Sequence, residues 1–228
     1  MKLKMTLAVV LVLLVGPLIM QLSAQERPET LRLTVNRLEL RNVKAEPVTY
    51  RGRAAMRVTE AGANAGNAET LAIIRGTSFR DGTIELDMSG DTAPNAPAFM
   101  RGFVGIAFHV SADGSHFECF YLRPKNGRSD DQLQRNHSVQ YVSIPGFDWQ
   151  KLRTMTPGKY ESYVELVPGQ WTHVKIRVKG QRAWLYVGGA KQPVLVVNDL
   201  KQPAASGGIA LWIGPGTIAY FSDLKITP

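Results

Sequence analysis

A two-residue alternation of apolar and polar side chains recurs in short segments along this chain. In GTIELDMSG, residues 82–90, the apolar side chains of Ile84, Leu86 and Met88 alternate with polar ones. The segment WTHVKIRVKG, residues 171–180, repeats the pattern. Because successive side chains of a strand point to opposite faces of a sheet, each such segment predicts a strand with one buried face.

Two further segments show the same period. In GFVGIAFHV, residues 102–110, the apolar face is expected to hold Val104, Ile106, Phe108 and Val110. The opposite face of that strand would carry Phe103, Gly105, Ala107 and His109. In GGIALWIG, residues 207–214, the inward side chains are expected to be Ile209, Leu211 and Ile213.

Further short apolar segments, separated by turn residues, bring the expected number of strands to about a dozen. Gly180 stands between two of them, where its tolerance of positive φ predicts a tight hairpin. No segment carries a convincing helical period. So many short antiparallel strands in one domain predict an all-β fold, a two-sheet antiparallel β-sandwich of jelly-roll type.

The N-terminus predicts a domain organisation with an export signal. Lys2 and Lys4 precede an apolar run that ends near small residues, which is typical of a secretory signal peptide over residues 1–24. Leu22 is large for the third position before the cleavage site expected after Ala24, so an uncleaved membrane anchor remains the alternative. We expect a polar tether over residues 25–37, the sandwich over 38–228, and a secreted or periplasmic protein.

Charge and cysteine content narrow the function classes. Cys119 is the only cysteine, so the chain has no internal disulfide, and we expect Cys119 to be a small buried hydrophobe. The net charge of +8 falls to +6 without Lys2 and Lys4, and the remaining basic residues are scattered, which suits acidic surfaces or glycans. With neither a basic stripe interleaved with aromatic residues nor a glycine-rich phosphate loop, we expect no nucleic acid partner.

Several of these segments together resemble the concanavalin A-like lectin and glucanase superfamily, including laminin-G-like modules. The resemblance covers about residues 38–228 and is clearest in PGQWTHVKIRVKGQRAWLYVGG and GGIALWIGPGTIAYFSDLKI. One similar family is that of exported 3-keto-disaccharide hydrolase domains. The resemblance implies the sandwich fold, whereas lectins, glycan hydrolases and protein-binding modules all use this fold.

The glucanase members of that superfamily, in family 16 of the glycoside hydrolases, use carboxylates that alternate along one strand, about 5 to 5.5 Å apart. Here Glu85 and Asp87 alternate in this way along one strand. The glucanase pattern also needs a Glu two or three residues after the Asp, and those positions hold Ser89 and Gly90. Glu118 and His109 are the other weak candidates for acid or base. The sequence therefore identifies no catalytic residues, and it does not decide whether the chain is an enzyme.

The longest polar stretch, between Phe120 and Tyr141, is the strongest candidate for a ligand-binding surface. Sugars offer adjacent hydroxyls that paired donors and acceptors bind, and aromatic rings can support their apolar faces. On this reasoning the expected ligand-binding residues are Arg123, Asn126, Arg128, Asp130, Asp131, Gln134, Arg135, His137, Tyr141, Trp149 and Arg153. The alternative is that Arg and Asp pair with each other and fix a long connection against the sheet.

Metal binding is not predicted. Asp130 and Asp131 are weak calcium candidates, but their spacing matches no EF-hand loop and basic residues surround them. We therefore expect no cofactor, with calcium as the alternative.

Three hypotheses follow: a lectin-like module that binds a carbohydrate, a glycan-cleaving hydrolase related to glucanases or 3-keto-disaccharide hydrolases, and a protein-interaction module. We expect a carbohydrate ligand and, unless the signal is an uncleaved anchor, no membrane partner. The oligomeric state does not follow from the sequence.

Overall fold

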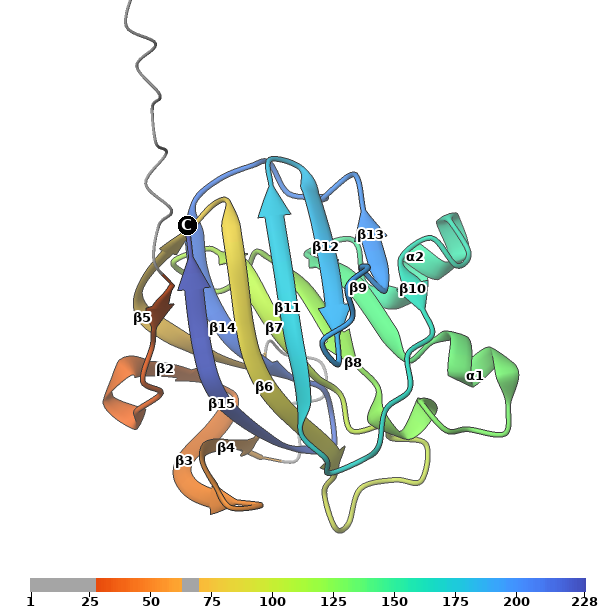
Figure 1. The fold of residues 1–228 in the computed structure, drawn as a ribbon, viewed down its shortest axis with the longest axis horizontal. Coiled ribbons are helices and arrows are strands. Elements are labelled where there is room, and N and C mark those ends of the chain that lie inside the picture. Colours follow the sequence, from red (N-terminus) through yellow and green to blue (C-terminus); the bar gives the residue numbers. More distant parts are fainter. Residues whose placement is uncertain (1–27, 63–69) are drawn as a thin grey trace, which may run out of the picture.

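The alternating segments form the strands of two antiparallel sheets that pack face to face (Figure 1). The structure is a computed structural model that describes residues 28–62 and 70–228. The predicted all-β fold, a two-sheet antiparallel β-sandwich of jelly-roll type, is confirmed.

The first sheet, which we call the eight-stranded sheet, has the strand order β13-β12-β11-β6-β15-β4-β3, and β1 pairs with β15. Its strands are β1 (Glu29–Thr30), β3 (Val43–Tyr50), β4 (Arg53–Glu60), β6 (Gly82–Thr92), β11 (Thr172–Lys179), β12 (Arg182–Val187), β13 (Leu195–Val197) and β15 (Thr217–Thr227). Gly180 makes the β11–β12 turn with a φ of 58°, as the sequence predicts.

The second sheet, the seven-stranded sheet, has the order β10-β9-β8-β7-β14-β5-β2. Its strands are β2 (Leu38–Arg41), β5 (Leu71–Phe79), β7 (Val104–Val110), β8 (Phe117–Leu122), β9 (Val139–Ile144), β10 (Glu161–Ser162) and β14 (Gly207–Ile213). Short helical turns connect some strands: η1 (Val35–Arg37), η3 (Pro124–Asn126), α1 (Gln132–Asn136) and α2 (Trp149–Met155).

One apolar core lies between the sheets. Ile84, Leu86 and Met88 of β6 are almost fully buried in it, and their polar neighbours along the strand face outward, as the alternation predicts. Burial of each such side chain stabilises the fold by about 1.5 to 3 kcal/mol. All residues of β7 are buried, so the outer face of this strand is also covered. Cys119 is buried and free, as expected, and burial raises the pKa of its thiol well above the usual value.

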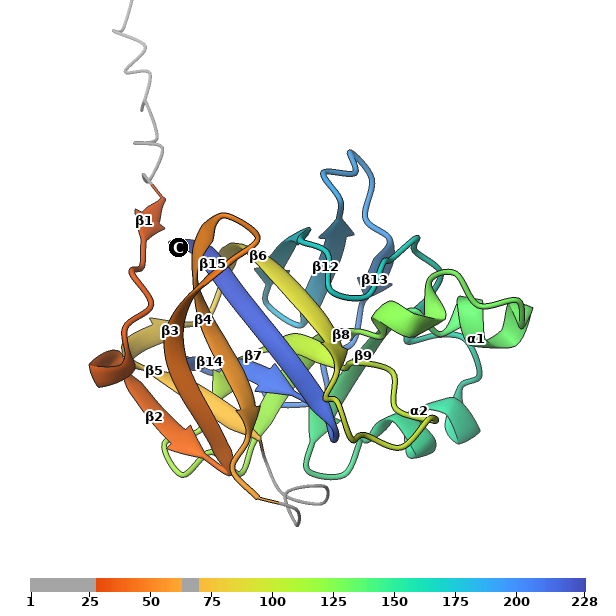
Figure 2. The ribbon, with the colours of Figure 1, turned by 90° about the horizontal axis from the view of Figure 1, so that it is seen from below.

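Two short α-helices interrupt the β-structure, although the sequence shows no helical period. Asp131 caps α1 by accepting hydrogen bonds from the N–H groups of Leu133 and Gln134, and Asp148 caps α2 by accepting one from Lys151. Both views place these helices beside β9 and β10, at the end of the sandwich opposite β2 and β3 (Figures 1 and 2). They therefore form walls at one end of the seven-stranded sheet.

The signal peptide predicted over residues 1–24 lies outside the described residues. Within the predicted tether, residues 25–37, the pair Glu29–Thr30 forms β1, and Leu31 is buried and donates its N–H to the carbonyl of Leu224. The sandwich therefore begins before residue 38. The helices of the described segments are all too short or too polar to cross a membrane.

Candidate functional site

A pocket of about 700 Å³ opens on the outer face of the seven-stranded sheet, the face turned away from the core. Its floor comes from β8, β9, β14 and Phe103, and its walls come from α2, the rest of the 99–103 loop and the segment around η3 and α1. We refer to it as the pocket. Phe99 and Trp149 stand at its rim with 68% and 40% of their surface exposed.

The pocket has an aromatic floor made by Trp212, Tyr121 and Phe103. Trp212 on β14, Gly105 on β7 and Tyr121 on β8 lie in register across three neighbouring strands. The Trp212 and Tyr121 rings meet across Gly105 with centroids 4.8 Å apart. A Cβ atom at position 105 would lie 2.5 Å from the carbonyl oxygen of Phe120 and 2.6 Å from Cβ of Tyr121. Glycine is therefore required for this floor.

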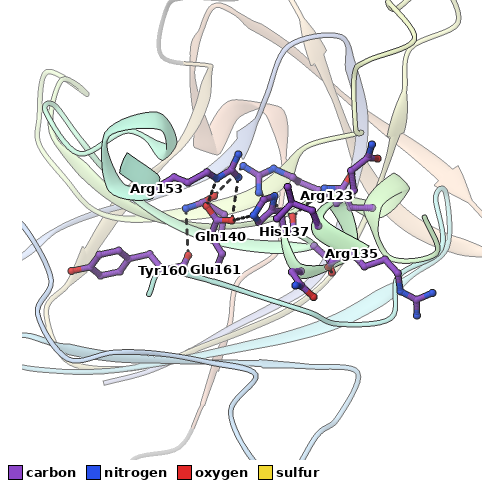
Figure 3. A network of polar contacts seen from close by, with 12 residues as sticks. Arg123, Arg135, His137, Gln140, Arg153, Tyr160 and Glu161 are labelled. Atoms are coloured by element: carbon purple, nitrogen blue, oxygen red, sulfur yellow. Dashed lines mark hydrogen bonds and ion pairs between the residues drawn. The ribbon is translucent and has the colours of Figure 1, made fainter. Parts of the chain in front are cut away.

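Arg123 lies at the edge of the floor with only 5% of its surface exposed. Its Nη2 donates to the Tyr121 hydroxyl at 2.8 Å and to Oε1 of Gln140 at 3.0 Å, and its Nη1 donates to the His137 carbonyl at 2.9 Å. Figure 3 shows Arg123 close to His137 and Gln140. These acceptors fix the plane of the guanidinium, and none of them carries a charge.

Beside Arg123, the carboxylate of Glu161 is held by two side chains from different segments. Arg153 of α2 donates Nε to Oε1 at 2.8 Å and Nη2 to Oε2 at 3.1 Å, and Nε2 of His137 lies 2.8 Å from Oε2 (Figure 3). The Glu161 side chain is only 3% exposed. The Arg153 guanidinium also lies over the Trp149 ring, 4.8 Å from its centroid. The network thus joins α2 to the edge of the sheet.

The protonation states of this region follow from its burial. Burial raises the pKa of Tyr121 to about 12, so its hydroxyl stays protonated and can donate as well as accept. Burial, helped by the charges of Arg153 and Arg123, lowers the pKa of His137 even though Glu161 acts in the opposite direction. At neutral pH His137 is therefore an uncharged imidazole whose Nε2–H donates to Glu161.

The pocket contains six of the eleven ligand-binding residues expected from the sequence: Arg123, Asn126, Gln134, His137, Trp149 and Arg153. The remaining five lie elsewhere. Arg128 pairs with Glu165 on the surface, Arg135 donates to the Tyr163 hydroxyl, and Asp130 is exposed. The alternative expected Arg to pair with Asp, whereas the observed partners of Arg128 and Arg135 are Glu165 and Tyr163.

Tyr141 and Glu118 point into the core, away from the pocket. The Tyr141 hydroxyl donates to Oε2 of Glu118, and Oε1 of Glu118 accepts the N–H of Gln202 at 2.7 Å. Glu118 is fully buried, and burial raises its pKa. This pair ties the connection between β13 and β14 to the sheet, so both residues have a structural role here.

The four candidate acid or base residues are not brought together. Glu85 and Asp87 lie on the outer face of the eight-stranded sheet, where Asp87 pairs with Arg53 and with His173. Glu118 lies in the core, and Nε2 of His109 bonds to the carbonyl of Arg80 at 2.8 Å on the seven-stranded sheet. No single groove contains this set.

The weak calcium candidates also have other surroundings. Asp131 uses Oδ1 to cap α1, and Asp130 beside it is exposed. In residues 28–62 and 70–228, no three His, Cys, Asp or Glu side chains come close enough together to hold a metal ion.

The aromatic floor, Phe99 and Arg101 line the pocket but are not among the residues predicted from the sequence. The sequence does contain part of the information needed to predict this floor. The alternation in residues 207–214 turns Trp212 away from the core, and the alternation in residues 102–110 does the same for Phe103. The order of strands in the sheet, which brings these residues beside Tyr121, is not written in any one segment.

Comparison with known proteins identifies the fold. No protein family and no curated protein sequence matches the chain. Among solved structures, the carbohydrate-binding module CBM66 from Bacillus subtilis aligns over 82% of this chain and 97% of its own, with a TM-score of 0.53 and 13% identity. A Bacillus subtilis protein of unknown function with a galectin-like fold aligns over 85% of this chain and 90% of its own, with a TM-score of 0.51 and 12% identity. The chain therefore shares the jelly-roll sandwich fold of these two structures, the fold that the resemblance of its sequence segments implied.

Proposed function

We propose that the protein is a lectin-like module that binds a carbohydrate in the pocket. The observation that carries this proposal is the meeting of the aromatic floor with the fixed guanidinium of Arg123 in one concave site. Pockets of this kind, mostly apolar with a few convergent polar groups, are typical of small-ligand sites.

The two parts of the site suit the two sides of a sugar ring. The apolar C–H face of a pyranose or furanose can stack on the Trp212 and Tyr121 rings. Hydroxyl groups at the ring edge can accept from Arg123 and exchange hydrogen bonds with the Tyr121 hydroxyl, which keeps its proton at neutral pH. The arrangement thus offers stacking and paired hydrogen bonds within one pocket.

The fold supports the same proposal. CBM66 of Bacillus subtilis, which shares the sandwich, is by name a carbohydrate-binding module. Binding without cleavage is favoured over a hydrolase because Glu85, Asp87, Glu118 and His109 lie on different faces of the sandwich. Both oxygens of Glu161, the buried carboxylate nearest the pocket, already accept hydrogen bonds.

We further propose that the protein is exported. The support is the pattern of Lys2, Lys4 and the following apolar run, which is typical of a secretory signal. Export would place the pocket where glycans of the cell envelope or surroundings are available.

The test of the carbohydrate proposal uses a pair of tryptophans. Trp212 lies on the aromatic floor, and Trp184 lies on the outer face of the eight-stranded sheet, each partly exposed. The protein and both variants, Trp212→Ala and Trp184→Ala, would be applied to a panel of immobilised polysaccharides, and released sugars would be measured in the same tubes. We expect retention on at least one polysaccharide, at least about tenfold weaker binding in Trp212→Ala, and no change in Trp184→Ala.

Two results would contradict the proposal. Equal loss in both variants would mean that the pocket is not the binding site. Release of sugar products, abolished by Asp87→Asn or Glu118→Gln, would show an enzyme and overturn the binding reading.

A further inference from the structure

We propose that the carbohydrate bound in the pocket carries an anionic group, a carboxylate or a sulfate, which pairs with Arg123 and Arg101. The inference rests on the proposed function and specifies the class of ligand. It follows from the charges that the pocket leaves without a counter-ion.

Arg123 is a nearly buried cation without an anionic partner in the described part of the chain. All three of its hydrogen-bond acceptors, the Tyr121 hydroxyl, the Gln140 amide and the His137 carbonyl, are uncharged. Burial of a charge is costly unless another charge compensates it. An anionic group of a ligand at the pocket surface would provide that compensation.

A second guanidinium has the same character. Arg101 lines the pocket and donates through Nη1 to the carbonyls of Ala98 at 3.0 Å and Met100 at 3.2 Å. Within residues 28–62 and 70–228 it forms no ion pair. These bonds to its own loop hold Arg101 at the wall, where its charge also faces the ligand space.

The acidic residues near the pocket do not cancel these charges. Glu161 is occupied by Arg153 and His137, and its charge balances that of Arg153. Among the lining residues in the described part of the chain, Asp148 is the one carboxylate, and its Oδ1 accepts the Lys151 N–H that caps α2. With His137 uncharged, the lining has three guanidinium groups against Asp148 and the neighbouring Glu161, so it remains positive.

The shape of these groups indicates how such a ligand would bind. The two hydrogen bonds of Arg101 both use Nη1, so its Nε–H and Nη2–H form a parallel pair of donors that matches the two oxygens of a carboxylate or a sulfate. Both Nη2 hydrogens of Arg123 are already engaged, so Arg123 would contribute its charge and single N–H donors. The sugar ring would lie on the aromatic floor, and its anionic substituent would point toward Arg123 and Arg101. A uronic acid residue or a sulfated sugar has this combination of a ring and an edge charge.

Matched saccharide pairs test the inference. An oligogalacturonate would be compared with its methyl ester, and a sulfated galacto-oligosaccharide with its desulfated form, by titration calorimetry at low and at high salt. We expect the anionic member of at least one pair to bind at least tenfold more tightly at low salt, with a smaller difference at high salt. The pair that responds identifies whether carboxylate or sulfate is preferred.

Charge-removing variants locate the effect. Arg123→Gln and Arg101→Gln are expected to abolish the preference for the anionic member while some binding to the sugar ring remains. Arg101 lies at the wall and is partly exposed, so its variant tests the idea even if Arg123→Gln folds poorly. The control is Arg177→Gln on the outer face of the eight-stranded sheet, which should keep the full preference.

The outcomes separate the two proposals. If neutral and anionic members bind equally, or if Arg177→Gln removes the preference as strongly as Arg101→Gln, the inference is wrong and the carbohydrate proposal stands. If the folded protein binds neither these pairs nor the immobilised polysaccharides, both proposals fail.

Discussion

Each outer face of the sandwich carries a trio made of one carboxylate, one Arg and one His, and the two trios lie in different surroundings. On the eight-stranded sheet, Asp87 accepts from Arg53 and lies 2.9 Å from Nδ1 of His173. On the seven-stranded sheet, Glu161 accepts from an Arg and a His in the same way. The Asp87 side chain is 17% exposed and its partners are 48% exposed, whereas the Glu161 side chain is 3% exposed. A carboxylate with an Arg and a His partner is therefore partly exposed on one face and buried on the other.

The difference comes from what covers each face. The outer face of the eight-stranded sheet carries cations that lie over aromatic rings at the surface, as Lys175 does over Tyr186 and Arg177 over Trp184. On the other face, Glu161 lies against Arg153 of α2 and against His137 at the end of α1, and its side chain is only 3% exposed. The strands of both sheets follow the same alternation. The pocket on the seven-stranded sheet therefore depends on the loops and helices that connect its strands.

The sharpest test of this contrast removes one carboxylate from each trio. We expect Glu161→Gln to lower the free energy of unfolding by about 3 kcal/mol, because it leaves Arg153 without its buried partner. Asp87→Asn should cost less than about 1 kcal/mol, since exposed ion pairs contribute little. Urea unfolding of both variants measures the difference, and similar losses would contradict the contrast.

The aromatic floor exists on the pocket side only because Gly105 leaves room for it. We expect Gly105→Ala to cost about 2 kcal/mol, because its Cβ would collide with the Phe120 carbonyl and β7 and β8 would have to separate. Gly208→Ala in the neighbouring strand β14 is the control, as the nearest atom to its Cβ would lie 3.6 Å away. Thermal unfolding of both variants is the measurement, and equal stability would show that the floor tolerates a side chain.

Salt provides a smaller but independent test of burial. In 1 M NaCl the screening length falls to about 3 Å, so we expect the cost of Asp87→Asn to fall toward zero. The cost of Glu161→Gln should change less, because the Glu161 carboxylate is only 3% exposed and dissolved ions screen a buried charge weakly. A salt dependence of the same size for both variants would mean that the two trios are equally solvated.

The pH dependence of stability should show the smallest effect. The pKa of His137 is lowered by burial and by two neighbouring guanidinium groups, so its contribution is fully present above the unfolded value of about 6.5 and is lost as the pH falls through the folded pKa. We expect the free energy of unfolding to decrease more between pH 7.5 and pH 5 in the wild type than in His137→Gln. The pKa of His109 is also lowered by burial, so both proteins keep part of the decrease. Parallel pH curves would contradict the prediction.

The sequence predicted the fold well because alternation is a local property. Each strand of the type of β6 or β11 shows its buried face within eight or so residues, which a single segment contains. The helices α1 and α2 were missed because five and seven residues are too few to show a period of 3.6. The two Asp caps were the available signal.

The site was predicted only in part, and the reason is geometric. In SVQYVSI, apolar residues occupy both parities of the strand, so the sequence does not decide whether Tyr141 or Val142 faces the core. Glu118 stands in FECFYL, where the same ambiguity holds. Trp212 and Tyr121 meet only because β14, β7 and β8 are neighbours, and this order depends on the whole sheet.

The position of β1 has a practical consequence for display of the protein. β1 pairs with β15 close to the C-terminus, so both ends of the described chain lie together, away from α1 and α2 (Figures 1 and 2). Attachment to a bead, a sensor chip or a fused partner through either end would leave the pocket facing the solution. Immobilised protein should therefore have the same ligand capacity whichever end is anchored.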